Sequence, residues 1–426
     1  MVFHLPQHKR KVAVIAGVIG NVMEWYDFAL YGYMAAILAH LFFPGDSKVA
    51  SLLAVYGTFA AGFIMRPIGS ALFGWLGDTT GRSATMMISV SMMVVPTVAL
   101  GLLPTYATIG IAAPIFLVII RLAQGLSVGG EFSSSVTYLV ETSPPGQRGL
   151  SGSFANVGSL MGSLLGSGMA AAVTWFLNPA DLHEWGWRLP FLFGGVLGVS
   201  AIYLRRHLPK SEHFAKHVAE RGKTSPLAEA FLNNRRQMMQ GTLFAASYGS
   251  LYYLILVYLP TWLSHYTPLA LKDAMPWNTL ATALLIPIIP LAGWISDRYF
   301  RRTHVLVAVM LTLAGLAIPM FHFIKTGDPI VAGVAQIVFA LLIAFPCGIG
   351  PALFTELFPT RDRLSGYSVS FNVGMGLVGG ATPALVTWLI SVTGYDALPG
   401  LFMVVAGLIA AVSLIWMRDR SREPLE

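Results

Sequence analysis

Long apolar runs separated by short polar turns extend over the whole chain. A helix that crosses a bilayer needs about 20 apolar residues, and the sequence contains twelve runs of that kind. The runs span residues 12–40, 50–76, 84–103, 110–140, 151–176, 188–206, 238–264, 277–296, 303–324, 329–356, 366–392 and 398–417. Apolar residues are continuous within each run and do not alternate with polar ones, which excludes a membrane β-barrel. The pattern predicts an all-α membrane protein with twelve transmembrane helices.

One long polar stretch, residues 207–237, divides these runs into six and six. We predict a bundle over residues 1–206, a soluble and partly helical linker over 207–237, and a second bundle over 238–426. A turn phrase with Gly-Trp, Asp and Arg occurs at residues 74–82 and returns at residues 293–302, about half a chain later. A polar turn that recurs in the second half is typical of a carrier built from two related halves.

A second repeated phrase supports the same duplication. Glu141 and Arg148 are seven residues apart, as are Glu356 and Arg363, and an Asn-Val-Gly sequence follows each pair. Two independent phrases that recur at corresponding positions of the two halves predict two pseudo-symmetric six-helix bundles.

Charged residues are scarce and unevenly distributed. Hydrophobic residues make up 55% of the chain and charged residues 11%, and the mean hydropathy is +0.67, whereas soluble domains are about one quarter charged. With a cytoplasmic N-terminus, only Lys48, Arg188, Lys272 and Lys325 lie on the opposite face. The positive-inside rule therefore places both termini and the linker in the cytoplasm, in a multi-pass protein of the cytoplasmic (inner) membrane. Topology explains the net charge of +7, so no nucleic-acid partner is expected.

The first apolar run is preceded by basic residues, as a signal peptide is. It is too long for one, contains Glu24 and Asp27, and lacks a clear small-residue cleavage site. We therefore expect it to be retained as the first membrane helix.

Five charged residues lie deep inside predicted helices of the first half. Charges inside a bilayer are costly and usually mark a transport pathway or a proton relay. They are Glu24, Asp27, Arg66, Arg121 and Glu131. The second half offers polar and amphipathic groups instead of comparable charges, which predicts that the first bundle handles the proton and the ligand charge.

Glu24 and Asp27 are three residues apart, so their carboxylates share nearly one face of a helix. Burial and mutual repulsion favour protonation of these groups, and a nearby Arg121 opposes it. We expect Arg121 to hold one of the two carboxylates in the empty protein and a ligand carboxylate in the loaded one. Glu131 is a third candidate for proton coupling or for a cytoplasmic latch, whereas Arg66 is expected to be structural.

Three phrases give the chain a family resemblance. They are GNVMEWYDF at residues 20–28 followed by Tyr31-Gly32, RPIG at 66–69, and RLAQGLSVGGE at 121–131. With the repeated turn, they make the chain resemble the major facilitator superfamily over essentially its whole length, and within it the metabolite:proton symporter family. The resemblance implies proton-driven uptake of small polar metabolites, typically organic acids or zwitterions such as betaines.

The residues and the resemblance together assign candidate roles. Proton coupling is assigned to Glu24, Asp27 and Glu131. Substrate binding is assigned to Arg121, Gln124, Tyr31, Asn156, Tyr248, Tyr252 and Asn372. For Tyr248 and Tyr252, packing in the core is an equal alternative. Charge pairs that gate the cytoplasmic side, a latch that the superfamily implies, are assigned to Asp78, Arg82, Asp297, Arg298, Glu141 and Glu356. Thr79 and Phe300 depart from the usual turn phrase and would weaken one latch.

Small residues and prolines predict how the helices pack and bend. Gly158, Gly162 and Gly166 repeat at every fourth position, as do Gly376 and Gly380, which predicts close helix contacts. The phrase Pro-Cys-Gly-Ile-Gly-Pro at residues 346–351 predicts a break suited to bending.

Catalysis is not expected, because the chain shows no phosphate-binding loop, metal-ligand spacing or nucleophile constellation. No cofactor is expected, and protons are the coupling ion. The expected partners are a small carboxylate or zwitterion and the lipid bilayer, and a monomer is the default. The chain runs only nine residues past Met417, without the coiled coil known in osmosensing members, which favours an organic acid over proline or betaine.

Three alternatives stay open. A drug/proton antiporter would be expected to carry a Gly-Pro phrase in the fifth helix, but residues 154–176 contain no proline. A sensor that binds a metabolite without moving it is compatible with the sequence. A lipid-facing structural protein would not need five buried charges.

Overall fold

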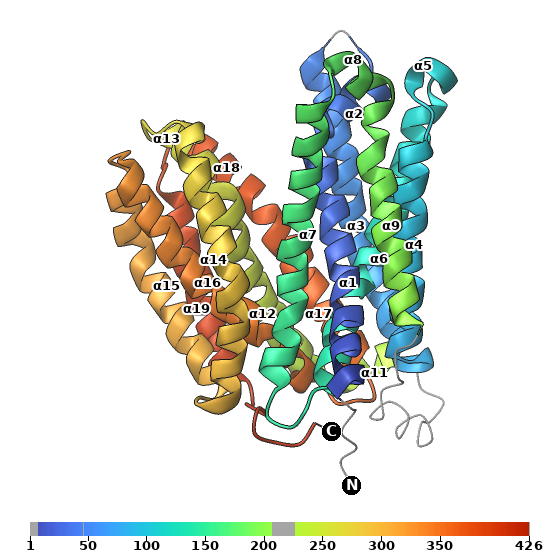
Figure 1. Cartoon of the computed structure of the whole chain (residues 1–426). Coiled ribbons are helices and arrows are strands. Elements are labelled where there is room, and N and C mark those ends of the chain that lie inside the picture. The colour runs from blue at the N-terminus through green and yellow to red at the C-terminus, as the bar shows by residue number, and fades with distance from the viewer. Residues whose placement is uncertain (1–6, 46, 207–225, 426) are drawn as a thin grey trace. The chain divides into compact units, whose positions relative to one another are not determined.

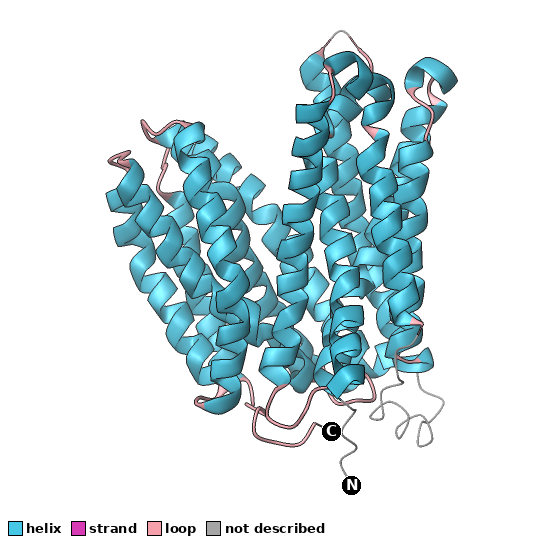
Figure 2. Cartoon of the chain, viewed as in Figure 1, coloured by secondary structure: helices cyan, strands magenta, loops and turns pink. Residues whose placement is uncertain are grey.

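Helices are the only regular elements in the part of the chain that the computed structural model describes, residues 7–45, 47–206 and 226–425 (Figure 2). By length and composition, 11 helical segments there can cross a membrane. The remaining predicted span is α1 (Gln7–Tyr33), which α2 (Ala35–Phe42) continues after a break at Met34. The prediction of an all-α protein with twelve transmembrane helices is confirmed.

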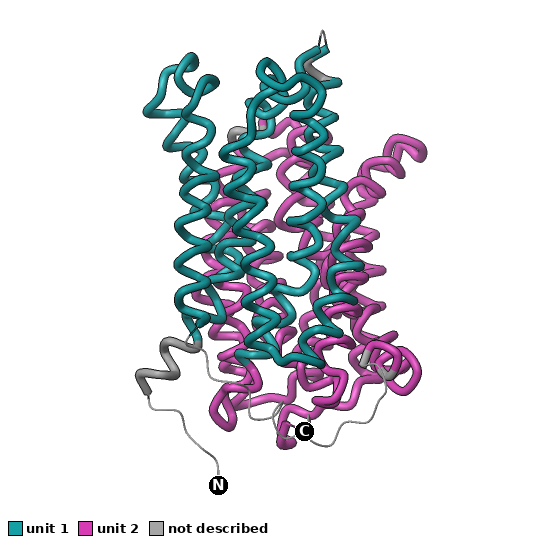
Figure 3. Tube along the Cα trace, turned by 90° about the vertical axis from the view of Figure 1, so that its right-hand side faces the viewer, with its two compact units in different colours: residues 1–139, 158–222 teal, residues 140–157, 223–426 magenta. Residues whose placement is uncertain are grey.

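The chain divides into two compact units (Figure 3). The first contains residues 1–139 and 158–222. After α1 and α2, its elements are α3 (Lys48–Thr80), α4 (Arg82–Leu102), α5 (Tyr106–Ile109), α6 (Ala112–Glu141), α7 (Arg148–Phe176), α8 (Pro179–Asp181), the π-helical turn η1 (Leu182–Gly186) and α9 (Arg188–Arg205) (Figure 1).

The second unit contains residues 140–157 and 223–426, so it includes the end of α6 and the start of α7. Its further elements are α11 (Pro226–Asn233), α12 (Arg235–Tyr252), η2 (Tyr253–Tyr258), α13 (Leu259–Tyr266), α14 (Leu271–Arg298), α15 (Arg302–Ile324), α16 (Pro329–Leu357), α17 (Arg363–Phe371), η3 (Asn372–Gly379), α18 (Gly380–Thr393) and α19 (Leu398–Trp416). Residues 207–225 of the predicted linker lie outside the described residues, and residues 226–237 form α11 and the start of α12.

Two of the predicted spans are not uniform α-helices. The π-helical turn η2 lies between α12 and α13, and η3 lies between α17 and α18. The apolar pattern did not reveal either turn, because a π-helical turn changes the hydrogen bonding of the backbone without requiring a polar residue.

Glycines on α7 let this helix touch α1 through its backbone. A Cβ atom added at Gly158 would lie 2.6 Å from Val18 Cγ1, and one added at Gly166 would lie 2.6 Å from the Tyr26 carbonyl oxygen. A Cβ atom at Gly162 would overlap the Val22 carbonyl oxygen. The predicted close contact of the fifth membrane helix is confirmed.

The matching prediction for Gly380 is wrong. A Cβ atom added there would meet nothing within 4 Å. The close approach in this part of the chain comes instead from Gly374 and Gly379 in η3, which lie against Ala245 and Gly249 of α12. The π-helical turn rotates the following residues, so the four-residue spacing read from the sequence selected the wrong face.

Helices α3 and α6 also meet backbone to backbone. A Cβ atom at Gly62 would lie 3.2 Å from the Arg121 carbonyl oxygen, and one at Gly129 would overlap the Arg66 carbonyl oxygen. This contact fixes the heights of Arg66 and Arg121 relative to each other, and both side chains reach α1.

Candidate functional site

Asp27 is fully buried in α1 and accepts three hydrogen bonds. Arg121 Nη1 donates to Oδ2 at 2.8 Å. Gln124 Nε2 and Thr97 Oγ1 each donate to Oδ1 at 2.9 Å. The donors come from α4 and α6, and both carboxylate oxygens are satisfied, as a buried charge requires.

Arg121 is held by an aromatic ring as well as by Asp27. Its Cζ atom lies 3.9 Å from the centre of the Tyr31 ring, and the Tyr31 hydroxyl is hydrogen-bonded to Thr58 Oγ1. Thr58 in turn donates to the Val55 carbonyl oxygen at 2.8 Å. The Arg121 Nε atom has no partner among the described residues. A planar guanidinium with an unused donor is suited to binding a second carboxylate.

Glu24 makes a separate and looser pair. Arg66 Nη2 lies 3.3 Å from Glu24 Oε1, and both residues are buried. The Arg66 Cζ atom is 4.7 Å from the centre of the Phe63 ring and 5.2 Å from that of Phe28. Arg66 was expected to be structural, and the structure places it on one of the two carboxylates of α1.

Glu131 is bound more tightly than sequence reasoning expected. Arg205 donates to both of its oxygens, with Nη1 at 3.0 Å from Oε2, and Ser89 Oγ also donates to Oε2. Arg205 further donates to the carbonyl oxygens of Ala16 at 3.0 Å and Met86 at 2.7 Å. These bonds join α1, α4, α6 and α9, so the pair acts as a structural clasp of the first unit.

Asn156 completes the hydrogen bonding of a proline-containing helix. Pro351 has no N–H, so the Cys347 carbonyl oxygen lacks its usual helical donor. Asn156 Nδ2 donates to that oxygen at 2.7 Å. The predicted break at residues 346–351 is wrong, because α16 is helical without interruption from Pro329 to Leu357. A side-chain donor replaces the missing backbone donor, as membrane helices often arrange.

The candidate substrate-binding residues of the second half contact a neighbouring helix or their own helix. The Tyr248 hydroxyl lies 3.2 Å from Cys347 Sγ. The rings of Tyr248 and Tyr252 are 6.4 Å apart and meet edge to face, and Tyr253 continues the cluster. Asn372 Nδ2 donates to the Ser368 carbonyl oxygen, one helical turn away, at 2.9 Å.

Asp297 caps the start of α7 within the second unit. The backbone N–H groups of Gly149 and Leu150 donate to its two carboxylate oxygens at 2.8 and 2.9 Å, where an anion is favoured by the helix dipole. Arg302 Nη2 lies 3.0 Å from Asp297 Oδ1 and also binds Glu356 with two nitrogens, at 2.8 and 2.9 Å. We call these interactions the α7 latch.

Three further charge pairs lie at helix ends. Arg148 is 3.1 Å from Glu356, and Arg363 is 2.9 Å from Glu141, so both copies of the repeated Glu and Arg phrase are used. The arginine of each copy of the phrase pairs with the glutamate of the other copy. In the first unit Asp78, near the end of α3, is 3.1 Å from Arg82, the first residue of α4.

The structure does not bring Arg298 into the α7 latch. Its side chain is exposed, and its Cζ atom lies 5.9 Å from the centre of the Trp294 ring. The basic partner of Asp297 is Arg302, five residues later. Turn geometry decides which of the clustered arginines points inward.

The residues after α19 are hydrogen-bonded to the starts of α15 and α7. Asp419 Oδ2 accepts from the Thr303 N–H at 2.9 Å, and Oδ1 accepts from the Ser421 N–H at 2.9 Å. Burial opposes ionisation of this carboxyl group, but the bonds from Ser421 and Thr303 outweigh it and lower the pKa of Asp419 below its usual value. Arg148 donates to the Glu423 carbonyl oxygen at 2.6 Å.

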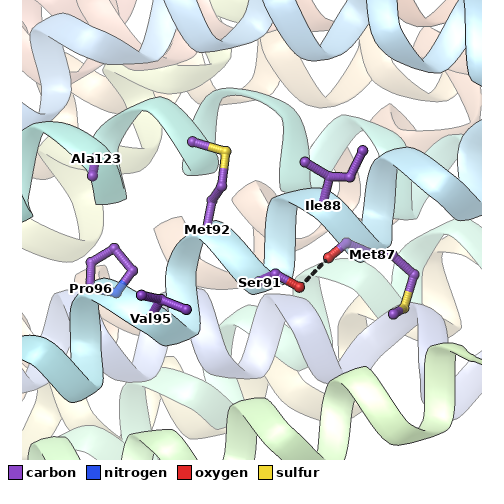
Figure 4. A pocket seen from close by; sticks show the side chains of 7 residues that line it. All are labelled: Met87, Ile88, Ser91, Met92, Val95, Pro96 and Ala123. Atoms are coloured by element: carbon purple, nitrogen blue, oxygen red, sulfur yellow. Dashed lines mark hydrogen bonds between the residues drawn. The ribbon is translucent and has the colours of Figure 1, made fainter.

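A hollow of about 500 Å³ on α4 and α6 is separate from these charges. It is lined by Met87, Ile88, Ser91, Met92, Val95, Pro96 and Ala123 (Figure 4). Ser91, the one hydroxyl in this lining, donates to the Met87 carbonyl oxygen at 2.8 Å in its own helix. Ile88 and Val95 are 42% and 67% exposed, so this is an apolar outer surface and not the charged site.

Sequence reasoning missed several members of these networks. Thr97 carried no signal, because a threonine in an apolar run is common. Arg205 lies at the end of the predicted span 188–206 and was not among the charges singled out inside helices, although the buried Glu131 required a partner. Arg302 stood in the repeated turn but was not distinguished from its neighbours. Among the described residues, no group of three or more His, Cys, Asp or Glu side chains is placed to hold a metal ion.

Comparisons with known proteins agree with this architecture. A family model described as sugar (and other) transporter matches residues 12–241 and 220–418. The chain is 33% identical to an ectoine/proline transporter of Corynebacterium glutamicum, over 99% of this chain and 86% of that protein. It is 32% identical to a citrate-proton symporter of Klebsiella pneumoniae, over 97% and 93% of the two chains. A solved proton:xylose symporter superposes with a TM-score of 0.83 at 17% identity, covering 99% of this chain and 98% of the other, a likeness of fold.

Proposed function

Because the chain belongs to the sugar (and other) transporter family, among the metabolite:proton symporters of the major facilitator superfamily, we propose that it imports a small carboxylate-bearing metabolite together with protons. The observation that carries this proposal is the buried Asp27 and Arg121 pair with its fixed hydrogen bonds. A buried arginine close to acids on another helix provides a site for a substrate carboxylate beside a group that can take a proton.

Restoration of charge balance around Arg121 is the proposed binding step. In the empty protein Asp27 neutralises the guanidinium. When a carboxylate of α1 takes a proton, the positive charge around Arg121 is no longer balanced, and a substrate carboxylate restores neutrality. Proton and substrate therefore favour each other's binding, which is the thermodynamic requirement for symport.

Charge balance also explains why neither ligand crosses alone. A buried site with one unbalanced charge is costly to enclose in a low-dielectric interior. The empty site and the site with both proton and carboxylate have the same net charge. Only these two states are expected to pass between outward-facing and inward-facing forms.

The α7 latch is the proposed cytoplasmic gate. Asp297 accepts a hydrogen bond from the Gly149 N–H, and Glu356 pairs with Arg148. Glu141, at the end of α6, pairs with Arg363. Breaking these bonds would free the ends of α6 and α7 for the inward-facing form. Asp78 and Arg82 are assigned the equivalent position in the first half, from the repeated turn.

We place both termini in the cytoplasm and the protein in the cytoplasmic membrane as a monomer. The asymmetric distribution of lysine and arginine supports the orientation. A cysteine-accessibility scan of the turns in intact cells tests it.

A zwitterion such as proline or a betaine is the second candidate substrate. The cluster of Tyr248, Tyr252 and Tyr253 favours it, because aromatic rings bind quaternary ammonium groups. In the first unit, the rings nearest the buried charges already hold guanidinium groups, as Tyr31 holds Arg121. Because these rings already bind guanidinium groups, they favour an organic acid over a quaternary ammonium compound as the substrate.

A thermal-shift panel tests the substrate class. Purified protein in detergent is heated with organic acids, amino acids or betaines at two pH values, since a bound ligand raises the unfolding temperature. A carboxylate that stabilises more at the lower pH is then tested for accumulation in proteoliposomes with an inward proton gradient. Stabilisation without accumulation would identify a sensor, and export of cationic drugs in exchange for protons would contradict import.

A further inference from the structure

The Oε2 atom of the buried Glu24 carboxylate has no hydrogen-bond partner among the described residues. We propose that Glu24 is the residue that carries the transported proton, on its Oε2 atom, while Asp27 remains ionised and serves as the counter-ion of Arg121. This assignment rests on the proposed symport and goes further, because it separates the proton site from the site of the substrate carboxylate.

The other two buried acids of the first unit are already satisfied as anions. Both oxygens of Asp27 accept hydrogen bonds, three in total. Both oxygens of Glu131 accept bonds from Arg205, and Ser89 adds another. Each oxygen of both carboxylates therefore has a hydrogen-bond donor, as a buried charge requires.

Glu24 has the opposite surroundings. Its side chain is 2% exposed, and its one ion pair, with Arg66, spans 3.3 Å through Oε1. Arg66 Nε and Trp25 Nε1 also lack partners among the described residues. The unsatisfied atoms of the paired Glu24 and Arg66 side chains point to a place that takes up a small polar guest, a proton or a water molecule that delivers it.

Charged groups of both signs lie on the helices around Glu24. Arg66 faces it from α3, Glu131 and Arg205 lie on α6 and α9 as a closed pair, and Asp27 follows one turn later on α1. A proton on Oε2 leaves Oε1 free to keep accepting from Arg66. The neutral acid can therefore form without rearranging the pair.

The proton step is balanced in charge. A proton from the outer solution binds Oε2 and converts the carboxylate to a carboxylic acid. The two arginines then face only one buried carboxylate, Asp27, and the excess positive charge is matched by the substrate carboxylate. Both guanidinium groups lie against the Phe28 ring, at 5.2 and 5.5 Å from its centre, so the two pairs are near enough to influence each other electrostatically. On the inner side substrate and proton leave, and Glu24 is again ionised.

Accumulation in proteoliposomes tests the assignment with citrate, 2-oxoglutarate and proline as radiolabelled probes. With one proton per substrate, an inward gradient of one pH unit supports about tenfold accumulation, because 1.4 kcal/mol corresponds to a factor of ten. Glu24→Gln should reduce accumulation to about onefold while exchange of labelled for unlabelled substrate continues without dependence on pH. Asp27→Asn should lose exchange as well, because Arg121 loses its counter-ion. The exposed Glu184→Gln is the matched control and should accumulate as the wild type does.

An infrared measurement decides the question without a known substrate. Protein reconstituted in lipid is titrated, and the carbonyl stretch of protonated carboxyl groups is followed. The titrating band should be absent in Glu24→Gln and unchanged in Glu131→Gln. A band that persists in Glu24→Gln and disappears in Asp27→Asn would overturn the assignment. If the wild type shows the Glu24 band but accumulates none of the probes, the proposed import fails while the protonation of Glu24 stands.

Discussion

At the scale of single residues, the shape of a cation decides how well a buried carboxylate is held. The Arg121 guanidinium binds Asp27, binds Gln124 and stacks on the Tyr31 ring at once. The ammonium group of lysine has the same charge but lacks the planar shape and the rigidly paired N–H donors of a guanidinium. Function at this position is therefore expected to depend on geometry and not on charge alone.

We expect Arg121→Lys to lower substrate uptake at least tenfold. Loss of one charge-assisted hydrogen bond costs about 1.5–3 kcal/mol, and 1.4 kcal/mol is a factor of ten. Initial uptake rates in proteoliposomes measure the effect. Tyr31→Phe keeps the ring beneath Arg121 and removes only the hydroxyl, so its loss should be smaller. Wild-type uptake by the lysine variant would show that Arg121 does not bind the substrate.

Arg205 is expected to be essential for stability. Removing one partner of a buried ion pair leaves an uncompensated charge, which costs about 3–5 kcal/mol. Arg205→Ala leaves Glu131 in that state, whereas its exposed neighbour Arg206 can be replaced by alanine with a change within about 0.5 kcal/mol. Thermal unfolding in detergent compares the two. Equal unfolding temperatures would mean that the Glu131 and Arg205 pair contributes nothing to stability.

At the scale of elements, backbone contacts between helices depend on single glycines. Gly162 and Gly168 lie on the same helix, α7, but only Gly162 has a backbone neighbour within reach of an added Cβ atom. We expect Gly162→Ala to destabilise by about 1–3 kcal/mol, the usual cost of overpacking. Gly168→Ala should be neutral or slightly stabilising. Thermal unfolding of the two variants separates packing from helix propensity, and a neutral Gly162→Ala would refute the close contact.

The chain after α19 is expected to stay bound above about pH 4 and to detach below it. The pKa of Asp419 is below its ordinary value, so its stabilising contribution is complete above the unfolded value of about 3.9 and is lost as the pH falls through the folded value. Fluorescence anisotropy of a dye at Leu425→Cys measures this, since the single native cysteine, Cys347, is buried. Anisotropy should be constant from pH 8 to 5. Asp419→Asn should show low anisotropy throughout, and a variant as rigid as the parent would contradict the role of this carboxylate.

At the scale of the whole molecule, transport requires the gate to form and to break. Asp297→Asn weakens the bonds to the start of α7 and to Arg302. A hydrogen bond to a charged group contributes about 1.5–3 kcal/mol, so the latched state should lose stability and uptake should fall about tenfold or more. The exposed Arg298→Gln is the control and should retain uptake. If both variants behave alike, the latch is not part of the transport cycle.

How much the sequence predicts differs between fold and site. Twelve apolar runs predicted the helices, because burial in a bilayer leaves a simple requirement of length and continuity. Glu24, Asp27 and Arg121 were found as candidates, because a charge in such a run is rare. The sequence predicted that Arg121 pairs with one of the two acids but not with which one, and the spacing on α1 gave no sign that Glu24 pairs with Arg66 instead.

The sequence by itself determined the class of protein, its membrane helices, its internal duplication and the buried charges that set its chemistry. Those features follow from local composition and from repetition along the chain. The tertiary structure alone decided which carboxylate each arginine holds, that Arg302 rather than Arg298 binds Asp297, and that Asn156 supports α16. These choices depend on the rotation and contact of helices far apart in sequence, which the apolar pattern of any single helix does not encode.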